Sequence, residues 1–440
     1  MFRRAIFMGK NIFVAGLDNF NLKILKRIKD GASIEFHPLL HYSEIRSSDE
    51  YRVKELIKTC EKRLDRFNHT IDGVIGYFDF PSTDIVPIIC KKYNLPSTSI
   101  GSVMSIENKL WARKEQHKVI KKHIPAFVGF NPNDIHSPKQ VDLVFPFWIK
   151  PIRSFKSYLA FKITDKESFL RGVAALKRDA MKITKPFRTL MDYAQIPEDF
   201  QPFLDCSCIA ESMELGNQCT VEGYVYNNEV ICYGIVDSIS EQDRSSLTAY
   251  EYPSRLPDHV QGKMIDLSKR IMAHIGYNNA TFNIEYFYNP EDGRISLLEI
   301  NPRCSQSHAP LFEKVDGISN LAIMVDLAMG KKPEFQKGGG LFNIAAKYMV
   351  RSYEDGIITA IPGREEIQNL KDRFPDAQIK LHVGAGTRLS RLYNQDSYTY
   401  ELMDIYIGGN DYQDLTDKYE ACLNMLKFSI DLKFRLPEVR

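Results

Sequence analysis

The sequence predicts a multidomain protein of mixed α/β and α+β architecture: a Rossmann-like N-terminal domain, a two-lobed central domain and a small C-terminal α+β domain. Three observations lead to this prediction. The chain has 440 residues, more than one hydrophobic core usually organises. Short apolar runs alternate with helical segments through the N-terminal part of the chain. Hairpin patterns separated by a helix dominate the middle of the chain.

The N-terminal domain, residues 1–104, is expected to be a doubly wound α/β unit. Apolar runs at residues 11–17, 34–40, 71–77 and 96–100 predict strands, and residues 20–29, 49–67 and 84–93 predict helices. The turn after the first strand, residues 16–20, lacks the glycine pattern that brings a pyrophosphate against a helix N-terminus. Dinucleotide binding is therefore not expected here.

The central domain is expected at residues 105–335, with a small lobe at about 125–205 and a large lobe at about 206–335. A charged helix at 105–123 precedes strands at 145–149 and 159–163, and strand patterns then dominate residues 207–238. A helix at 260–275 and a hairpin at 281–301 follow, and a helix at 318–329 leads to a glycine hinge at 338–340. The C-terminal domain, residues 341–440, should contain strands at 344–350 and 403–407 and a helix at 415–430.

Charge and hydropathy exclude two classes of partner. The formal net charge is +2, from 58 basic and 56 acidic residues, so no global field favours nucleic acid or an anionic membrane. Apolar stretches such as residues 143–149 are much shorter than a membrane-spanning helix requires. The eight cysteines lack zinc or redox spacing and are expected to be reduced structural thiols. We therefore expect a cytoplasmic protein.

The hairpin at 281–301 carries the most informative acidic residues. Glu299, Asn301 and Arg303 lie at alternate positions of an extended segment and so face the same way. If Tyr288 pairs with Arg294, Glu285 lies opposite Leu297 and diagonal to Glu299. Two carboxylates and an amide oxygen are hard ligands that suit Mg²⁺. The alternative is a surface hairpin with incidental acids, but Leu298 and Ile300 flank Glu299 in an apolar strand, where an unpaired carboxylate is costly.

Several charged residues precede this hairpin in a recognisable order. These are Lys109 at the start of a helix, Lys150 and Glu211 at strand ends, and Glu222 in a hairpin. Together with Glu285, Glu299, Asn301 and Arg303, over roughly residues 1 to 330, this order resembles the ATP-grasp superfamily of ligases, closest to L-amino acid ligases and biotin carboxylase-like carboxylate-amine ligases. The resemblance implies a pre-ATP-grasp domain followed by a two-lobed ATP-grasp domain.

The resemblance also implies a role for each matching residue. Lys109 and Lys150 would neutralise ATP phosphates, and Glu211, Ser212, Met213 and Leu215 would form the adenine hinge through backbone groups. Glu222 would lie near the ribose or the active site, with an exposed hairpin acid as the alternative. Glu285, Glu299 and Asn301 would bind Mg²⁺ (or Mn²⁺), and Arg303 would stabilise charge on the transferred phosphoryl group.

One segment departs from the superfamily pattern. The loop after the second lysine is usually rich in glycine, but residues 151–158 contain none. Ser154, Lys156 and Ser157 could supply phosphate donors in place of backbone amides, or the loop could be a surface turn. Further on, His308 could orient or deprotonate an amine nucleophile, or could simply be hydrogen-bonded within its loop.

The resemblance therefore implies an ATP- and Mg²⁺-dependent carboxylate-amine ligase that forms an amide through an acyl phosphate and releases ADP and phosphate. An amino acid or small peptide-like molecule is the implied substrate, and a homodimer is the implied assembly. Two alternatives remain: an ATP-dependent carboxylase of the biotin carboxylase-like type, although no biotinyl-carrier region is found, and a nucleotide-binding regulatory protein without turnover, suggested by the glycine-free loop.

Overall fold

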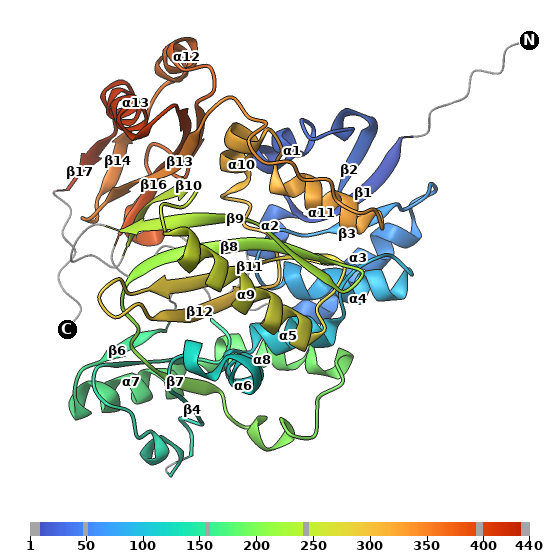
Figure 1. Ribbon diagram of the computed structural model, residues 1–440, viewed down its shortest axis with the longest axis vertical. Coiled ribbons are helices and arrows are strands. Elements are labelled where there is room, and N and C mark those ends of the chain that lie inside the picture. The colour runs from blue at the N-terminus through green and yellow to red at the C-terminus, as the bar shows by residue number, and fades with distance from the viewer. Residues whose placement is uncertain are drawn as a thin grey trace, which may run out of the picture.

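The computed structural model describes residues 9–46, 52–134, 136–154, 159–240, 246–392 and 399–432. Its N-terminal part is a parallel sheet of strands β1 (Lys10–Leu17), β2 (Ile34–His41) and β3 (Gly73–Ile75), in the order β2-β1-β3. Helices α1 (Asn19–Leu25), α2 (Tyr42–Arg46), α3 (Val53–Asp65) and α4 (Ser82–Lys92) accompany these strands. This part is blue in Figure 1. The predicted strand at 96–100 is wrong, because Ser99 instead caps a helix that begins at Ile100.

The predicted helix at 105–123 is two helices that meet at Asn108. Helix α5 spans Ile100–Glu107 and helix α6 spans Lys109–Ile120. The backbone of Asn108 is extended, and its side chain accepts hydrogen bonds from the amides of Leu110 and Trp111, which makes it the N-cap of α6. The break fixes Lys109 as the first residue of α6.

The small lobe is an antiparallel sheet with two helices, below the rest of the chain in Figure 1. Its strands are β4 (Phe127–Phe130), β5 (Phe147–Pro151), β6 (Phe161–Ile163) and β7 (Cys208–Ser212), in the order β4-β7-β5-β6. Helices α7 (Lys166–Asp179) and α8 (Met181–Arg188) follow β6. Buried apolar residues such as Phe147, Ile149 and Leu176 form the core of this lobe. Lys150 alternates with the core residues along β5 and so faces the other way.

One eight-stranded sheet runs through both the large lobe and the C-terminal unit. Its order is β12-β11-β8-β9-β10-β13-β16-β15. The strands are β8 (Asn217–Tyr226), β9 (Glu229–Ser240), β10 (Leu247–Tyr252), β11 (Ala280–Tyr288), β12 (Ile295–Asn301), β13 (Ile344–Ser352), β15 (Gln378–Leu381) and β16 (Tyr400–Gly409). The C-terminal unit predicted at 341–440 therefore extends the sheet of the large lobe through β13. Strands β14 (Ile357–Ala360) and β17 (Ser429–Asp431) form a separate pair.

Helices pack on both faces of the long sheet, with α10 (Ala309–Asp316) and α13 (Tyr412–Met425) on opposite faces of β13 and β16. Helix α9 (Asp258–Ile275) packs on β8 and β9 and lies in front of the sheet in Figure 1, and α13 packs on β13 and β16. Helix α10 contacts β10, β13 and β16, α11 (Asn320–Ala328) contacts β3 and β11, and α12 (Arg364–Arg373) contacts α13. The mixed α/β architecture is as predicted.

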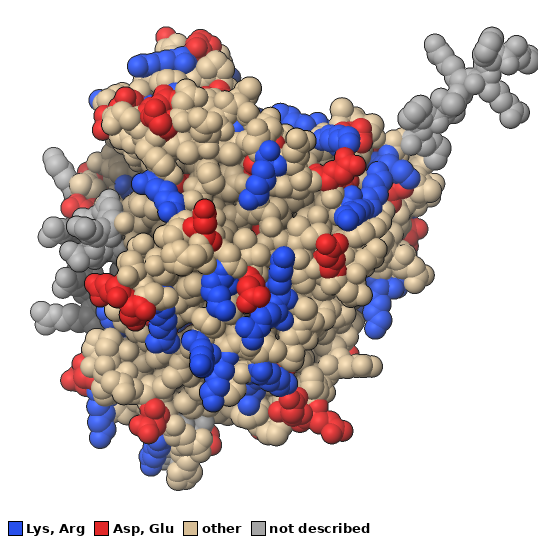
Figure 2. Space-filling model, viewed as in Figure 1, with Lys and Arg blue, Asp and Glu red and all other residues tan. Residues whose placement is uncertain are grey.

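The distribution of surface charge and the state of the cysteines are as expected from the composition. Figure 2 shows acidic and basic residues interspersed over the face in view. The eight cysteines are all free thiols. Among the described residues, no helix combines the length and the apolar character needed to cross a membrane.

Candidate functional site

The acidic hairpin places its two carboxylates directly opposite each other. Tyr288 pairs with Ile295, not with Arg294 as predicted, and a bulge between Glu285 and Tyr286 shifts the register once more. Glu285 therefore pairs with Glu299, so the predicted pairing with Leu297 is wrong. The register predicted from the turn missed the bulge, which inserts Leu298 as an extra residue on β12. The result is a closer approach of the two acids than the predicted diagonal.

The two carboxylates have different electrostatic surroundings. Burial and the negative charge of Glu299 raise the pKa of Glu285 to about 7, despite the opposing effect of Arg303. Burial also disfavours the ionised form of Glu299, but Lys109 and Lys150 hold its pKa below the ordinary value. The pair thus has unequal proton affinities, as expected when like charges face each other.

Amide side chains complete the polar group around Glu285. Asn301 pairs with Asn283 across the ladder, and its Nδ2 donates to Asn283 Oδ1 at 2.9 Å and to Glu285 Oε1 at 3.1 Å. Gln218 Nε2 donates to Glu285 Oε2 at 2.9 Å. Arg303 lies beyond the strand end and donates to Asp79 Oδ1 at 2.6 Å. The predicted grouping of Glu285, Glu299 and Asn301 is therefore present.

The two predicted phosphate-binding lysines enter the same site from different elements. Lys109 at the start of α6 forms an ion pair with Glu299. Lys150 on β5 lies 2.5 Å from Glu211 Oε2, and Arg113 Nε lies 2.5 Å from Glu211 Oε1. Burial would raise the pKa of Glu211, but Arg113 and Lys150 lower it to about 2. Glu211 is therefore the anion that holds two cations in place.

A small pocket lies where these elements meet, with about 270 Å³ of empty space that includes open solvent. It is lined by Ile106, Lys109, Ala112, Arg113, Gln116, Lys150, Glu211, Leu298, Glu299 and Ile300, from α5, α6, β5, β7 and β12. The small lobe and the acidic hairpin therefore share one pocket, whose charged groups are three cations and two carboxylates. An anionic group with a bound divalent cation could be accommodated by this combination.

The predicted adenine hinge is only partly free to act through its backbone. β7 is an inner strand, and Glu211 pairs with Phe127 on one side and Trp148 on the other. The Ser212 amide donates to the Ala126 carbonyl at 2.9 Å, so this amide is already used. The Glu211 carboxylate pairs with Arg113 and Lys150, and the predicted backbone role of Glu211 stays a prediction. Met213 and Leu215 lie beyond the strand end, and Leu215 is 64% exposed; their role stays a prediction.

Glu222 and His308 form a buried pair. Glu222 on β8 is 0% exposed, so the alternative of an exposed hairpin acid is wrong. Its carboxylate contacts His308 Nδ1 at 2.9 Å and accepts hydrogen bonds from the Tyr233 hydroxyl at 3.1 Å and the Ser305 amide at 3.2 Å. His308 is 2% exposed and packs edge-on against the Tyr250 ring at 4.7 Å. This arrangement agrees with the hydrogen-bonded alternative and fixes the loop that follows Arg303.

The glycine-free loop lies partly outside the described residues. Ser154 is described and is 5% exposed, so it is not a surface residue. Lys156 and Ser157 lie in the segment 155–158, outside the described residues. The phosphate-binding role predicted for these three residues stays a prediction.

Sequence reasoning missed several residues of the site. Arg113 was overlooked although it lies one helical turn after Lys109, a spacing that puts both on one face of α6. Asn283 was overlooked although it is two residues before Glu285 on the same strand and therefore shares its face. Asp79 carried no recognisable signal, because it contacts Arg303 from a loop of the N-terminal domain more than 200 residues away.

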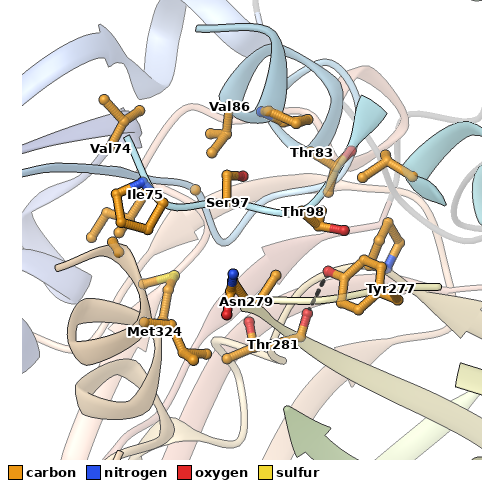
Figure 3. Close-up of a pocket in the computed structure, with 18 residues that line it drawn as sticks. Val74, Ile75, Thr83, Val86, Ser97, Thr98, Tyr277, Asn279, Thr281 and Met324 are labelled. Carbon is orange, nitrogen blue, oxygen red and sulfur yellow. Dashed lines mark hydrogen bonds between the residues drawn. The ribbon is translucent and has the colours of Figure 1, made fainter. Parts of the chain in front are cut away.

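A second pocket, with about 480 Å³ of empty space, lies between the N-terminal domain and the large lobe (Figure 3). Its walls include Val74, Val86 and Thr98 from one side and Tyr277, Asn279 and Met324 from the other. The Tyr277 hydroxyl donates to the Thr281 carbonyl at 2.7 Å, drawn as a dashed line. None of the predicted site residues lines this pocket. We assign it no ligand.

Comparisons with known proteins show what the sequence and the fold are similar to. Residues 214–335 match the family described as carbamoyl-phosphate synthase L chain, ATP binding domain. A segment of 94 residues is 34% identical to the carbamoyl phosphate synthase large chain of Micrococcus luteus, covering 21% of this chain and 8% of that one. The match therefore spans a small part of that relative. The segment 214–335 contains Glu222, Glu285, Glu299, Asn301 and Arg303.

Solved structures extend the likeness to nearly the whole chain. The L-amino acid ligase from Bacillus licheniformis superposes with a TM-score of 0.73 at 14% identity, over 96% of this chain and 99% of that chain. The biotin carboxylase from Campylobacter jejuni superposes with a TM-score of 0.63 at 15% identity, over 96% and 93%. Together with the family match, this fold confirms the resemblance to the ATP-grasp superfamily.

Proposed function

We propose that this chain is an ATP- and Mg²⁺-dependent carboxylate-amine ligase acting on an amino acid or a small peptide-like substrate. The observation that carries the proposal is the shared pocket of Lys109, Lys150, Glu211 and Glu299, with Glu285 paired opposite Glu299. The fold shared with the Bacillus licheniformis L-amino acid ligase supports the same conclusion. Because the sequence matches cover small parts of the relatives, the activity rests on the site and not on their names.

The donor set fits Mg²⁺. Glu285 and Glu299 face each other, and their mutual repulsion contributes to the raised pKa of Glu285. A divalent cation would relieve that repulsion, and Asn301 could add an amide oxygen. When bound there, Mg²⁺ would supply charge neutralisation for transferring phosphate oxygens. Lys109 and Lys150 would bind phosphate oxygens from the facing side of the pocket.

The chemistry follows from the need to activate a carboxylate. A substrate carboxylate oxygen attacks the terminal phosphorus of ATP, the bond to the bridging oxygen breaks, and ADP leaves. The amine nitrogen then attacks the acyl carbon, phosphate leaves with the bonding electrons, and the nitrogen loses a proton. Arg303, held by Asp79, would stabilise negative charge during both steps. His308, buried against Glu222, would position residues 305–308 and not transfer the proton itself.

A second candidate is an ATP-dependent carboxylase of the biotin carboxylase-like type. The likeness to the Campylobacter jejuni biotin carboxylase favours this candidate, because the two folds superpose over most of both chains. The same pocket would then activate bicarbonate in place of an organic carboxylate. The two candidates differ in the molecule that must be present for ATP to be consumed.

Phosphate release from ATP tests the proposal. The purified chain is incubated with ATP, Mg²⁺ and amino acids singly and in pairs, with bicarbonate as a separate arm. Release that requires both a carboxylate and an amine supports ligation, and release with bicarbonate and biotin supports the carboxylase. Release in no mixture, with ATP still bound, would favour a nucleotide-binding protein without turnover.

Two variants of the same hairpin make the assay specific. Glu299→Gln should abolish release, because it removes a metal ligand and the partner of Lys109. Glu291→Gln changes an exposed acid in the β11–β12 turn and should leave release unchanged. Equal release from the Glu299→Gln variant and the unsubstituted chain would remove the metal-site assignment.

A further inference from the structure

The sheet face that carries Glu285 continues into the C-terminal unit. Cα partners in an antiparallel ladder share a face, as do residues two apart on one strand. Along this face Phe287 pairs with Gln218, Gln218 with Ser238, Ser238 with Tyr250, Tyr250 with Lys347, and Lys347 with Tyr406. Asp404 is two residues before Tyr406 and pairs with Lys380 on β15. Lys380 therefore shares a face with Glu285.

Contacts connect the two ends of this face. The Tyr250 ring packs against His308 at 4.7 Å, and the charges of both Lys347 and Glu285 act on its hydroxyl. From the N-terminal domain, the Phe20 ring lies 5.2 Å from Lys380 Nζ. Phe20 also packs against Tyr406 at 5.5 Å. The N-terminal domain, the large lobe and the C-terminal unit thus meet around a polar surface that begins next to the proposed reaction site.

Most charges on this surface are already balanced. His382, Glu401 and Asp404 each offer an atom within 4.8 Å of the others, a spacing that a metal ion could use. However, Lys347 Nζ lies 3.1 Å from Asp404 and 3.6 Å from Glu401, so a cation already neutralises both carboxylates. A divalent ion would be repelled by this ammonium group. We therefore assign no metal to the cluster.

Lys380 differs from its neighbours because its charge is not paired. Within the described parts of the chain it forms no hydrogen bond and no ion pair within 4 Å, and it is partly buried. Asp18 is nearby, but its carboxylate accepts hydrogen bonds from the amides of Phe20 and Asn21 and the side chain of Asn21. On balance burial lowers the pKa of Lys380, although Asp404 and Asp18 oppose that effect. The charges of Asp404 and Asp18 therefore do not fully offset the cost of burying the Lys380 ammonium group.

We infer that Lys380 binds an anionic group of the substrate, at the end remote from the reacting atoms. This inference rests on the proposed function and narrows its substrate class to molecules with a second anionic group, a carboxylate or a phosphate. Lys380 on β15 lies three strand spacings from Tyr250 on β10, roughly 14 Å across the sheet, and six from Glu285 on β11, roughly 29 Å. A substrate that reaches Lys380 from the Tyr250 side of this surface needs about four or more extended residues, such as a short peptide with a free carboxyl end.

Matched ligand pairs test the inference. Each pair differs only in the anionic group: tetra-alanine and its C-terminal amide, hexa-alanine and its C-terminal amide, and trialanyl-O-phosphoserine amide and trialanylserine amide. Both equilibrium binding, by titration calorimetry, and phosphate release from ATP are measured for each ligand. The unsubstituted chain should favour at least one anionic member about tenfold, the worth of one charged hydrogen bond. The carboxylate and phosphate pairs distinguish the two kinds of anion.

Three variants distinguish the effect of the Lys380 charge from an effect on folding. Lys380→Gln should reduce the preference to about twofold or less without changing the KM for ATP. Lys380→Arg should retain the preference, and Lys371→Gln, an exposed lysine on α12 of the same unit, should leave it unchanged. Thermal unfolding of each variant verifies folding.

The outcomes for the inference and for the proposed function are distinct. Equal binding of the anionic and neutral members to the unsubstituted chain overturns the inference, as does a preference that survives in Lys380→Gln. Phosphate release in no mixture overturns the proposed ligase, while the calorimetric arm still decides whether Lys380 binds the anion.

Discussion

At the scale of single residues, the protonation state of Glu285 determines how strongly Glu285 and Glu299 repel each other. Its pKa is raised from the ordinary 4.5 to about 7. The free energy of unfolding therefore falls as the pH rises from about 4.5 to about 7, because the folded state resists the ionisation of Glu285. Glu285→Gln removes that loss and should stabilise the metal-free protein by about 1–3 kcal/mol at pH 8. The gain should be smaller at pH 5, where Glu285 is protonated. Urea unfolding in EDTA at both pH values measures the effect.

Magnesium supplies the control for this prediction. Mg²⁺ should stabilise the unsubstituted chain at pH 8 and have less effect on the Glu285→Gln variant, because a ligand is lost. Glu291→Gln, in the exposed turn of the same hairpin, should behave as the unsubstituted chain in both respects. A gain in stability that is equal at pH 5 and pH 8 would contradict the assignment of the raised pKa.

Glu211 is expected to have the opposite effect on the pH dependence of stability. Its pKa is lowered to about 2, so the stability that it contributes is present above about pH 4.5 and is lost as pH falls toward 2. Glu211→Gln at pH 7 leaves Arg113 and Lys150 without their carboxylate and should cost about 3–5 kcal/mol. The free energy of unfolding in urea measures the loss. The exposed Glu198→Gln serves as control, and a similar value for both variants would show that Glu211 does not hold the two cations.

The acidic residues of the candidate site could be predicted from sequence, but their basic partners could not all be. Alternation along one strand predicts that Glu299 and Asn301 share a side, and this needs no tertiary information. The partner of Arg303 is different, since Asp79 reaches it from a separate domain. The backbone role of Glu211 was implied by the family resemblance, and the sequence did not assign β4 and β5 as the neighbours of β7.

At the scale of elements, the start of α6 positions a phosphate-binding candidate. Asn108 caps this helix, and the Lys109 amide donates to the Ile152 carbonyl at 2.8 Å. Asn108→Ala should lower stability by about 1 kcal/mol and raise the KM for ATP severalfold, because the end of the helix that carries Lys109 loses its cap. Denaturant unfolding and initial rates measure the two effects.

A second capping residue separates stability from function. Asp411 caps α13 in the C-terminal unit, where its side chain accepts from the Asp414 amide at 2.9 Å. Asp411→Ala should destabilise the protein to a similar extent and leave the KM for ATP unchanged. If the two variants change the KM equally, Asn108 does not act by positioning Lys109.

Element boundaries were predicted best where the local residue types determine the backbone conformation. The turn at Asn227–Asn228 was predicted from the residue types, and both residues have positive φ angles of 48° and 66°. The bulge next to Glu285 was not predicted, because an extra residue on β12 leaves the hydrophobic pattern of the hairpin unchanged. The strand at 96–100 was wrong because its apolar and β-branched residues border a helix N-terminus.

At the scale of the whole molecule, the long sheet determines how the parts are joined. The sequence predicted a C-terminal unit at residues 341–440, but not that β13 pairs with β10. Strand pairing over such a separation depends on tertiary packing, for which short-range patterns carry no information. The shared sheet is what brings Lys380 onto the same face as Glu285.

A buried charge cluster also joins three parts of the chain. Asp84 on α4, Glu107 on α5 and Arg153 after β5 are each no more than 5% exposed. Arg153 forms an ion pair with Glu107, and the Thr83 hydroxyl donates to Glu107 at 2.6 Å. Burial and the charge of Glu107 raise the pKa of Asp84 well above its ordinary value. The N-terminal domain, the linking helix and the small lobe therefore depend on a single arginine for charge balance.

Opposite effects are expected from the two ends of this cluster. Arg153→Met leaves the carboxylates without their cation and should cost about 3–5 kcal/mol in the free energy of unfolding at pH 7. Asp84→Asn should be neutral or stabilising, and more stabilising at pH 9 than at pH 6, because ionisation of an acid with a raised pKa becomes costlier as pH rises. Urea unfolding at the three pH values measures both. A destabilised Asp84→Asn variant with an unaffected Arg153→Met variant would mean that hydrogen bonding to Asp84, and not the charge of Arg153, joins the domains.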